Sequence, residues 1–304
     1  MEPTQRDAVG KKVRTFYEDC SFPGYDDFDS PLDLIEKARR GMYARVLDEQ
    51  LPLGVRILDA GCGTGQLAIF LSMVHRNVVG ADFSRASLAK ANAFKRRFDL
   101  KRVSFVQMDL FQPALRPESF DYVFSNGVLH HTADAYGAFQ NLCTLVKPGG
   151  YITLGLYNSY GRLFLDARRW IFRVTRDHLQ RLDYFMRQKS TGAEKKRIWY
   201  MDQYKNPHED KFSVDDILGW FEKNAIEYVN AVPKIRLGRR FTSADSLFEP
   251  QAAGSRVEHL LCQFRWIFTE GREGGFFILL GRKKPLDGAR FRGDSNPSNL
   301  RLRQ

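Results

Sequence analysis

Short apolar runs that end in polar residues recur along the first half of the chain. They occupy residues 55–58, 77–83, 103–110, 120–131 and 151–157. The first run carries Val55, Ile57 and Leu58, a pattern typical of a strand that helices cover on both faces. We therefore predict an α/β fold with a doubly wound, mostly parallel sheet. Two further strands, over residues 227–232 and 275–282, are expected to pair as an antiparallel edge.

Helix signals precede and interrupt this pattern. Residues 11–50 should form helices before the sheet, and one of them should start at Ser30-Pro31 with Asp33 in its first turn. Residues 211–224 read as a helix with Ser213 as its N-cap. The predicted units are an N-terminal helical cap (1–50), a core (51–157), a helical insertion (158–212), the remainder of the sheet domain (213–284) and a tail expected to be disordered (285–304).

A glycine-rich turn follows the first strand. Its glycines, Gly61, Gly63 and Gly65, are spaced G-x-G-x-G after Asp59, and the dinucleotide fingerprint G-x-G-x-x-G fails because Gln66 stands at its third position. Such a turn brings backbone N–H groups to a ligand at the start of the next helix. The motif resembles the first motif of Rossmann-like, class I S-adenosylmethionine-dependent methyltransferases, and residues 50–157 match this family closely.

This resemblance implies a seven-stranded sheet, S-adenosylmethionine as cofactor and a set of cofactor contacts. Asp82 would accept hydrogen bonds from the ribose hydroxyls, Asp109 would bind the adenine amino group beside Met108, and residues 126–128 would hold the methionine moiety. The implied set is Asp59, Gly61, Gly63, Gly65, Asp82, Phe83, Met108, Asp109, Asn126 and Val128. The motif KPGG at residues 147–150 would be the turn before the fifth strand. Simpler interpretations remain open, because Asp59 and Asp82 also suit helix N-caps and Asp109 also suits a turn.

The charge of the chain is uneven. The net charge is +11, and the excess lies in residues 151–304, which carry 28 Lys and Arg against 18 Asp and Glu. The four cysteines are scattered without metal-ligand spacing, which disfavours a disulfide framework or a zinc site and predicts a reducing, cytoplasmic setting. No segment has the apolar length of a signal peptide or a membrane span. We therefore expect no metal and no transmembrane segment.

Much of the basic excess lies in residues 162–197 of the insertion, which show an amphipathic helical pattern. One face carries arginines, and the other is apolar. The arginines are Arg162, Arg169, Arg173 and Arg176, and the apolar residues are Leu163, Ala167, Trp170, Ile171 and Val174. Three roles compete: a lid over the substrate, a surface for peripheral contact with an anionic membrane, and a patch for RNA. We favour the lid, because insertions after the fifth strand commonly cover the acceptor in the resembled family.

The expected reaction is an in-line displacement at the sulfonium methyl, for which the protein positions the acceptor and removes a proton. His131 follows the fourth strand and is the candidate general base, although the His130–His131 pair would also suit the start of a helix. Further candidate acceptor contacts are His130, Tyr157, Tyr160, Tyr204, His208 and Glu209. Tyr17 and Tyr25 are candidates for closing over the cofactor, although aromatic packing explains them equally well.

The acceptor class is narrowed by what the fourth motif lacks. It reads SNGV, without the D/N-P-P-aromatic pattern of enzymes that methylate adenine amino groups in nucleic acids, and without the cysteine of the pyrimidine-C5 enzymes. We therefore predict methylation of an O, N or C atom of a small molecule. The alternatives are a tRNA methyltransferase that uses the basic second half, and a cofactor-binding scaffold without catalysis.

Overall fold

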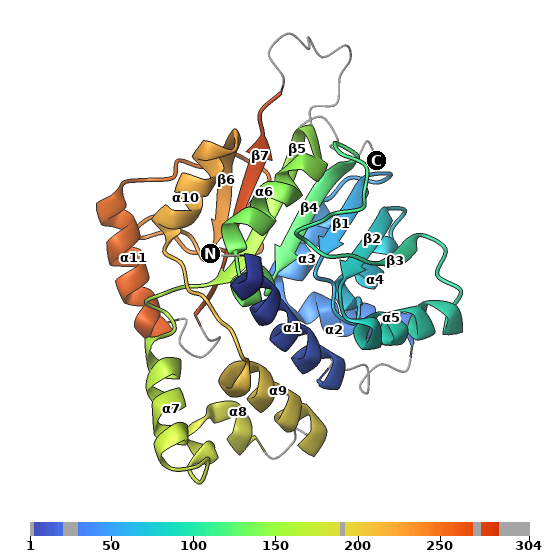
Figure 1. Cartoon of the computed structure of the whole chain (residues 1–304). Coiled ribbons are helices and arrows are strands. Elements are labelled where there is room, and N and C mark those ends of the chain that lie inside the picture. The colour runs from blue at the N-terminus through green and yellow to red at the C-terminus, as the bar shows by residue number, and fades with distance from the viewer. Residues whose placement is uncertain (1–2, 21–29, 189–191, 270–274, 286–304) are drawn as a thin grey trace.

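Seven strands form one sheet in the order β3-β2-β1-β4-β5-β7-β6 in the computed structural model. The structure describes residues 3–20, 30–188, 192–269 and 275–285. The strands are β1 (Arg56–Ala60), β2 (Asn77–Asp82), β3 (Val103–Gln107), β4 (Phe120–Asn126), β5 (Val146–Tyr157), β6 (Ile226–Val232) and β7 (Phe276–Lys283). Strands β1 to β5 pair in parallel, and β7 lies antiparallel between β5 and β6. The predicted fold class, including the antiparallel edge, is confirmed (Figure 1).

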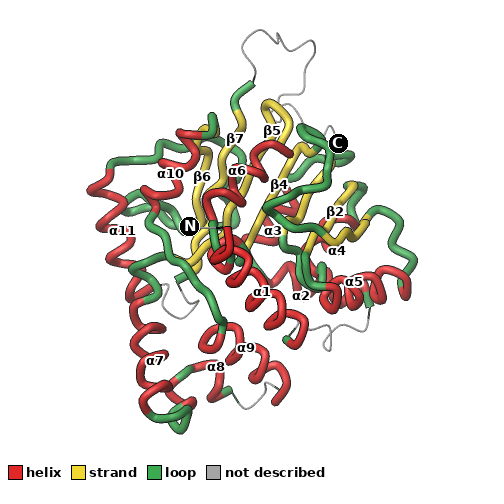
Figure 2. The backbone as a smooth tube through the Cα atoms, viewed as in Figure 1, coloured by secondary structure: helices red, strands yellow, loops and turns green. Residues whose placement is uncertain are grey.

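Helices cover both faces of this sheet, as the tube in Figure 2 also shows. They are α1 (Pro3–Asp19), α2 (Pro31–Arg40), α3 (Met42–Gln50), α4 (Gln66–Ser72), α5 (Arg85–Arg97), η1 (Leu129–His131), α6 (Ala135–Leu145), α7 (Leu163–Val174), η2 (Gln180–Leu182), α8 (Tyr184–Arg187), α9 (Ala193–Lys205), α10 (Val214–Lys223) and α11 (Arg256–Thr269). Ser30 and Ser213 cap α2 and α10 as predicted, and Asp216 completes a capping box.

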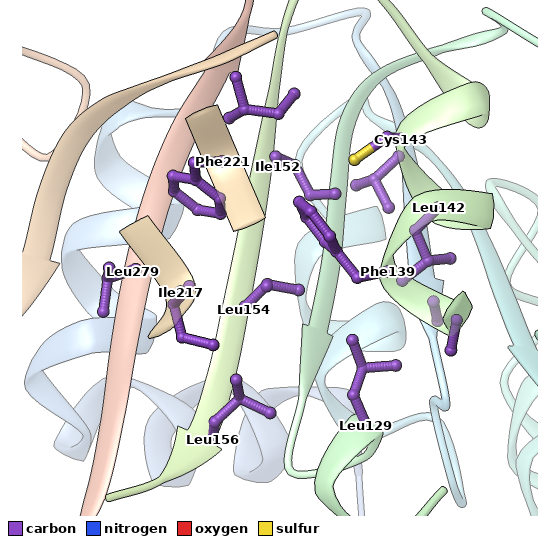
Figure 3. Close-up of a cluster of buried hydrophobic side chains, with 14 of the residues drawn as sticks. Leu129, Phe139, Leu142, Cys143, Ile152, Leu154, Leu156, Ile217, Phe221 and Leu279 are labelled. Atoms are coloured by element: carbon purple, nitrogen blue, oxygen red, sulfur yellow. The ribbon is translucent and has the colours of Figure 1, made fainter. Parts of the chain in front are cut away.

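Alternating side chains of the central strands divide between two cores. Leu58 and Val123 face one side, where Phe139 of α6 and Phe221 of α10 pack over the sheet (Figure 3). On the other side, side chains of β1 and β4 pack beneath α2, α3 and α4; they include Ile57, Tyr122 and Phe124. Because both faces of the central strands are buried, their middle positions are mostly apolar, and the polar residues lie mainly near their ends.

Three strand boundaries differ most from the sequence-based expectation. The fourth strand, expected over residues 120–131, ends at Asn126, and η1 occupies Leu129–His131. The KPGG segment, residues 147–150, lies within β5, so it is not a turn before the strand. Its pairing with β4 is irregular between Phe120 and Tyr122, and Gly149 adopts φ +76°. The third strand ends at Gln107, which places Met108 and Asp109 in the following loop.

The insertion, residues 158–212, differs more from expectation. The helical pattern over residues 162–197 is broken, because α7 ends at Val174 and Arg176 and Asp177 adopt positive φ. The prediction that the apolar face of this helix covers the substrate was also wrong, because Leu163, Trp170 and Val174 are exposed. The helix instead packs through Leu165 and Phe172, next to the arginine side of the pattern. On that side Arg162 is buried and Arg169 is partly buried, because both meet a carboxylate, as described below, while Arg173 and Arg176 stay exposed.

Within the described part of the chain, no helix combines the length and the apolar character needed to cross a membrane. No cluster of three metal-ligating side chains occurs among the same residues. The four cysteines are buried and unpaired. Residues 286–304, almost all of the predicted basic tail, lie outside the described residues.

Candidate active site

The carboxyl ends of the parallel strands meet at one edge of the sheet and border a cavity of about 920 Å³. Helices α1 and α9 supply other parts of its wall. Nine of the ten predicted cofactor residues line this cavity, and they are Asp59, Gly61, Gly63, Asp82, Phe83, Met108, Asp109, Asn126 and Val128. The structure thus brings together residues that are spread over 70 positions of sequence. The crevice outside the strand ends is the usual ligand site of open α/β sheets.

The glycine turn is shaped by steric demands that other residues would not meet. Gly61, Gly63 and Gly65 have φ of +83°, +53° and +79°, the left-handed region that side chains disfavour. A Cβ on Gly61 would lie 2.3 Å from Cγ2 of Val128. A Cβ on Gly65 would lie 2.5 Å from Cε1 of Phe105, so this tenth residue serves packing beside the cavity and does not line it.

Two carboxylates from neighbouring strands stand near this turn. Asp82 accepts backbone hydrogen bonds from Gly63 N (2.8 Å, Oδ2) and Ser84 N (2.8 Å, Oδ1). Each carboxylate oxygen has a second lone pair, so Asp82 can still accept hydroxyl donors from a ligand. Burial raises the pKa of Asp82, while these backbone bonds oppose the rise. Burial, and then the charge of Asp82, raises the pKa of Asp59 well above its usual range.

The loop after β3 adds an apolar and an acidic side chain. Met108 is buried, and its backbone N–H donates to the Asp82 carbonyl at 2.9 Å. Asp109 Oδ1 accepts from Phe111 N at 2.9 Å. Asp109 therefore closes a turn, as the simpler interpretation proposed, and its carboxylate still lies at the cavity wall.

Asn126, at the end of β4, holds an unsatisfied acceptor. Its Oδ1 is buried and has no hydrogen-bond partner among the described residues, although the residue lines the cavity. Leaving a buried acceptor unpaired costs about 1–3 kcal/mol. The residue therefore stands at the cavity wall, but Oδ1 itself is closed off from the cavity and packs beside Gly155 of β5.

His131 lines the same cavity with a defined tautomer. Its Nδ1 lies 2.8 Å from the carbonyl oxygen of His208, which can only accept, so Nδ1 carries the proton. Nε2 then keeps its lone pair. Burial lowers the pKa of His131, against the opposing influence of Asp202. A neutral imidazole with one free lone pair has the form that a general base requires.

The other predicted acceptor contacts divide. Tyr157 lines the cavity, whereas His130, Tyr160, Tyr204 and His208 do not. His130 is fully buried behind the wall, with its ring 4.0 Å from that of Tyr157, and burial lowers its pKa well below the usual value. Tyr204 donates to Asp183 in the apolar contact between α7 and α9, and His208 contributes its backbone carbonyl.

Glu209 is a supporting residue. Its carboxylate accepts hydrogen bonds from two arginines. Arg162 Nε lies 3.1 Å from Oε1, and Arg169 Nη2 lies 2.7 Å from Oε2. Burial alone would raise the pKa of Glu209, but the two guanidinium groups lower it to about 2. The Arg162 guanidinium also lies 3.5 Å from the centre of the Tyr157 ring, so the cluster holds one wall of the cavity in place.

The sequence analysis missed the contribution of α9. Trp199, Asp202 and Gln203 line the cavity from this helix. Asp202 is buried and accepts from Gln203 (2.8 Å) and from Tyr17 on α1 (3.3 Å). Tyr17 lines the cavity as one of the predicted closing residues, while Tyr25 lies outside the described residues. No motif marked α9, since its residues reach the cavity only through the packing of the insertion.

Comparisons with known proteins agree with this geometry. A family model described as a methyltransferase domain matches residues 53–225, more than half of the chain. The chain belongs to this family, and the predicted class I, S-adenosylmethionine-dependent type is confirmed. S-adenosylmethionine is the cofactor of that class.

Two curated relatives and one solved structure show which methyltransferases the chain resembles. The ubiquinone biosynthesis O-methyltransferase of Ruegeria pomeroyi is 31% identical over 154 residues, which cover 48% of this chain and 62% of the relative. The tRNA 5-carboxymethoxyuridine methyltransferase of Escherichia coli is 33% identical over 152 residues, 43% of this chain and 57% of the relative. The matched region thus covers little more than half of the length of these curated relatives. Magnesium protoporphyrin IX methyltransferase of Synechocystis, solved with bound S-adenosylhomocysteine, shares the fold with TM-score 0.50, 17% identity and coverage of 92% and 99%.

Proposed function

We propose that the protein transfers the methyl group of S-adenosylmethionine to an O, N or C atom of a small molecule. One observation carries this proposal: a single cavity of about 920 Å³ joins the predicted cofactor residues to a histidine in base-competent form. A cavity of this size accommodates a cofactor and a small acceptor. Helices α1 and α9 line it opposite the strand ends.

The residues at the strand ends suit the cofactor. Asp82 retains lone pairs for two ribose hydroxyls, Met108 offers an apolar surface for the adenine, and Asp109 suits its amino group. Asn126 at the end of β4 would lie beside the methionine moiety, as the family resemblance implies. When bound, S-adenosylmethionine supplies an electrophilic methyl group. These roles would hold the cofactor with its methionine end toward β4 and β5.

His131 would remove the proton from an acceptor whose nucleophilic atom carries one. The His208 carbonyl fixes the ring and holds the Nδ1 proton, so that Nε2 is available to receive a second proton. Tyr157, Asp202 and Trp199 would form the acceptor side of the cavity. The Trp199 ring would offer this side an apolar surface.

An RNA acceptor is the second candidate, because the second half of the chain is basic and a tRNA methyltransferase is among the relatives. The buried carboxylate of Asp202 in the cavity wall favours the small molecule, since it would repel a phosphate backbone that approached the methyl group.

Transfer of radiolabelled methyl tests the proposal. Wild-type protein is incubated with labelled S-adenosylmethionine and either a metabolite extract or bulk tRNA, with Asp82→Ala as the cofactor-deficient control. Label in the small-molecule fraction that disappears with the control supports the proposal. Label in tRNA would overturn it in favour of RNA, and cofactor binding without any transfer would identify the scaffold alternative.

A further inference from the structure

Helices α7 and α11 expose a long apolar surface that the proposed reaction does not use. It consists of nine large side chains, each between 48% and 68% exposed, and we call it the α7–α11 ridge. Its members are Leu163, Phe164, Trp170 and Val174 of α7, and Val257, Leu260, Leu261, Phe264 and Phe268 of α11. Scattered exposed apolar residues are ordinary, but contiguous apolar patches mark interaction sites.

The two parts of the ridge are continuous. The ring centres of Phe164 on α7 and Phe268 on α11 lie 5.9 Å apart, and those of Phe264 and Phe268 lie 6.2 Å apart. Figure 1 shows the end of α11 next to the start of α7, so that the helices follow one another along one side of the molecule. On α11 the exposed apolar residues recur mostly every three or four positions and share one face. On α7, Leu163, Trp170 and Val174 share one face, and Phe164 lies beside that face, toward α11.

The inner face of α11 fixes this orientation. His259 lies within hydrogen-bonding distance of Asp215 (2.9 Å) and the Ala253 carbonyl (2.8 Å). Gln263 accepts from Asn158 and from the backbone of Val214, both at 2.8 Å. These buried polar groups would lose their partners if the helix rotated to bury its apolar stripe. The outward orientation of the stripe is therefore stable.

Basic side chains flank the ridge. Arg173 of α7 and Arg256 and Arg265 of α11 are exposed and form no ion pair within the described residues. The nearby acids are occupied, since Asp166 binds Lys211 and Glu258 lies 3.7 Å from Arg236. An apolar and aromatic stripe between unneutralised arginines is typical of a helix that lies in the headgroup region of a bilayer.

We propose that the α7–α11 ridge docks on the surface of an anionic lipid bilayer. Its phenylalanine, tryptophan and leucine side chains enter the boundary between headgroups and acyl chains, and the three arginines contact lipid phosphates. Charge disfavours the other obvious occupant, a second copy of the chain. Two ridges face to face would bring like-charged arginines together, and no unpaired acid of α7 or α11 within the described residues would neutralise them.

Vesicle flotation of the full chain tests this proposal. The probes are mixed phosphatidylcholine–phosphatidylglycerol vesicles and pure phosphatidylcholine vesicles. Wild-type protein should float with the anionic vesicles and bind the neutral ones at least about tenfold more weakly. The double variant Phe264→Ser/Phe268→Ser should lose at least about tenfold in binding, because two apolar anchors are removed.

Controls separate docking from general effects. Leu32→Ser/Leu53→Ser removes two equally exposed leucines away from the ridge, 76% and 65% exposed, and should bind as wild type does. Arg173→Gln/Arg256→Gln/Arg265→Gln should lose the preference for anionic vesicles. Unchanged S-adenosylhomocysteine binding establishes that each variant is folded. Absence of vesicle binding, equal binding by the ridge variants, or a dimer in light scattering that the phenylalanine variant abolishes would overturn the proposal.

Discussion

Replacing Glu209 with glutamine tests the role given to the insertion. Glu209 is 4% exposed in its side chain and balances Arg162 and Arg169. Its pKa of about 2 in the folded protein, against an ordinary value of 4.5, corresponds to roughly 3 kcal/mol of stability at neutral pH. Removing one partner of a buried ion pair costs a similar amount, about 3–5 kcal/mol. We expect Glu209→Gln to destabilise the protein by about 3 kcal/mol at pH 7.

The pH dependence gives the stronger test. Because the pKa of Glu209 is lower in the folded protein, its stabilisation is fully present above pH 4.5 and is lost as the pH falls towards 2. Urea unfolding followed by tryptophan fluorescence should therefore show a gap between wild type and variant that shrinks below pH 4.5. Glu222→Gln, on the exposed side of α10, is the matched control and should change stability by less than about 0.5 kcal/mol. A gap below about 1 kcal/mol at pH 7, or one independent of pH, would refute this account of the cluster.

Two further predictions concern the cavity itself. Burial lowers the pKa of His131, so activity that needs its neutral form should rise with pH to a plateau reached below the usual imidazole range. The activity that remains in His131→Gln should not show this rise with pH. An unchanged pH profile in the variant would rule out His131 as the general base. Gly61→Ala places a methyl group 2.3 Å from Val128 at positive φ, and should cost about 1–3 kcal/mol in urea unfolding and weaken cofactor binding. Wild-type stability and binding in this variant would contradict the tight contact described for the turn.

The sheet and its glycine turn were predictable because their signals are local. A buried parallel strand needs consecutive apolar residues, and the turn after β1 needs glycines at positive φ, so both leave a pattern within a few positions. The cofactor side of the cavity follows, since parallel strands bring their carboxyl ends to one edge. Asp59, Asp82 and Asn126 therefore met where the motifs had placed them.

The insertion was predicted poorly because long-range contacts determine it. From helical periodicity alone, one predicts that the apolar face of α7 is buried. In the structure, however, Arg162 and Arg169 bind Glu209, which lies 40 or more positions away in the sequence. That pairing turns Arg162 and Arg169 inward and leaves Trp170 outside. The same limit hid Asp202, because nothing near it in sequence shows that α9 reaches the cavity.

Isothermal titration with S-adenosylhomocysteine tests the central claim most directly, that the edge of the sheet beyond β1 and β2 is a cofactor site. We predict one binding site per chain for wild type. Asp82→Ala should weaken binding by about 1–3 kcal/mol, because a hydrogen bond to a charged group is lost. Absence of binding to the folded wild-type protein, or equal affinity in the variant, would contradict the account.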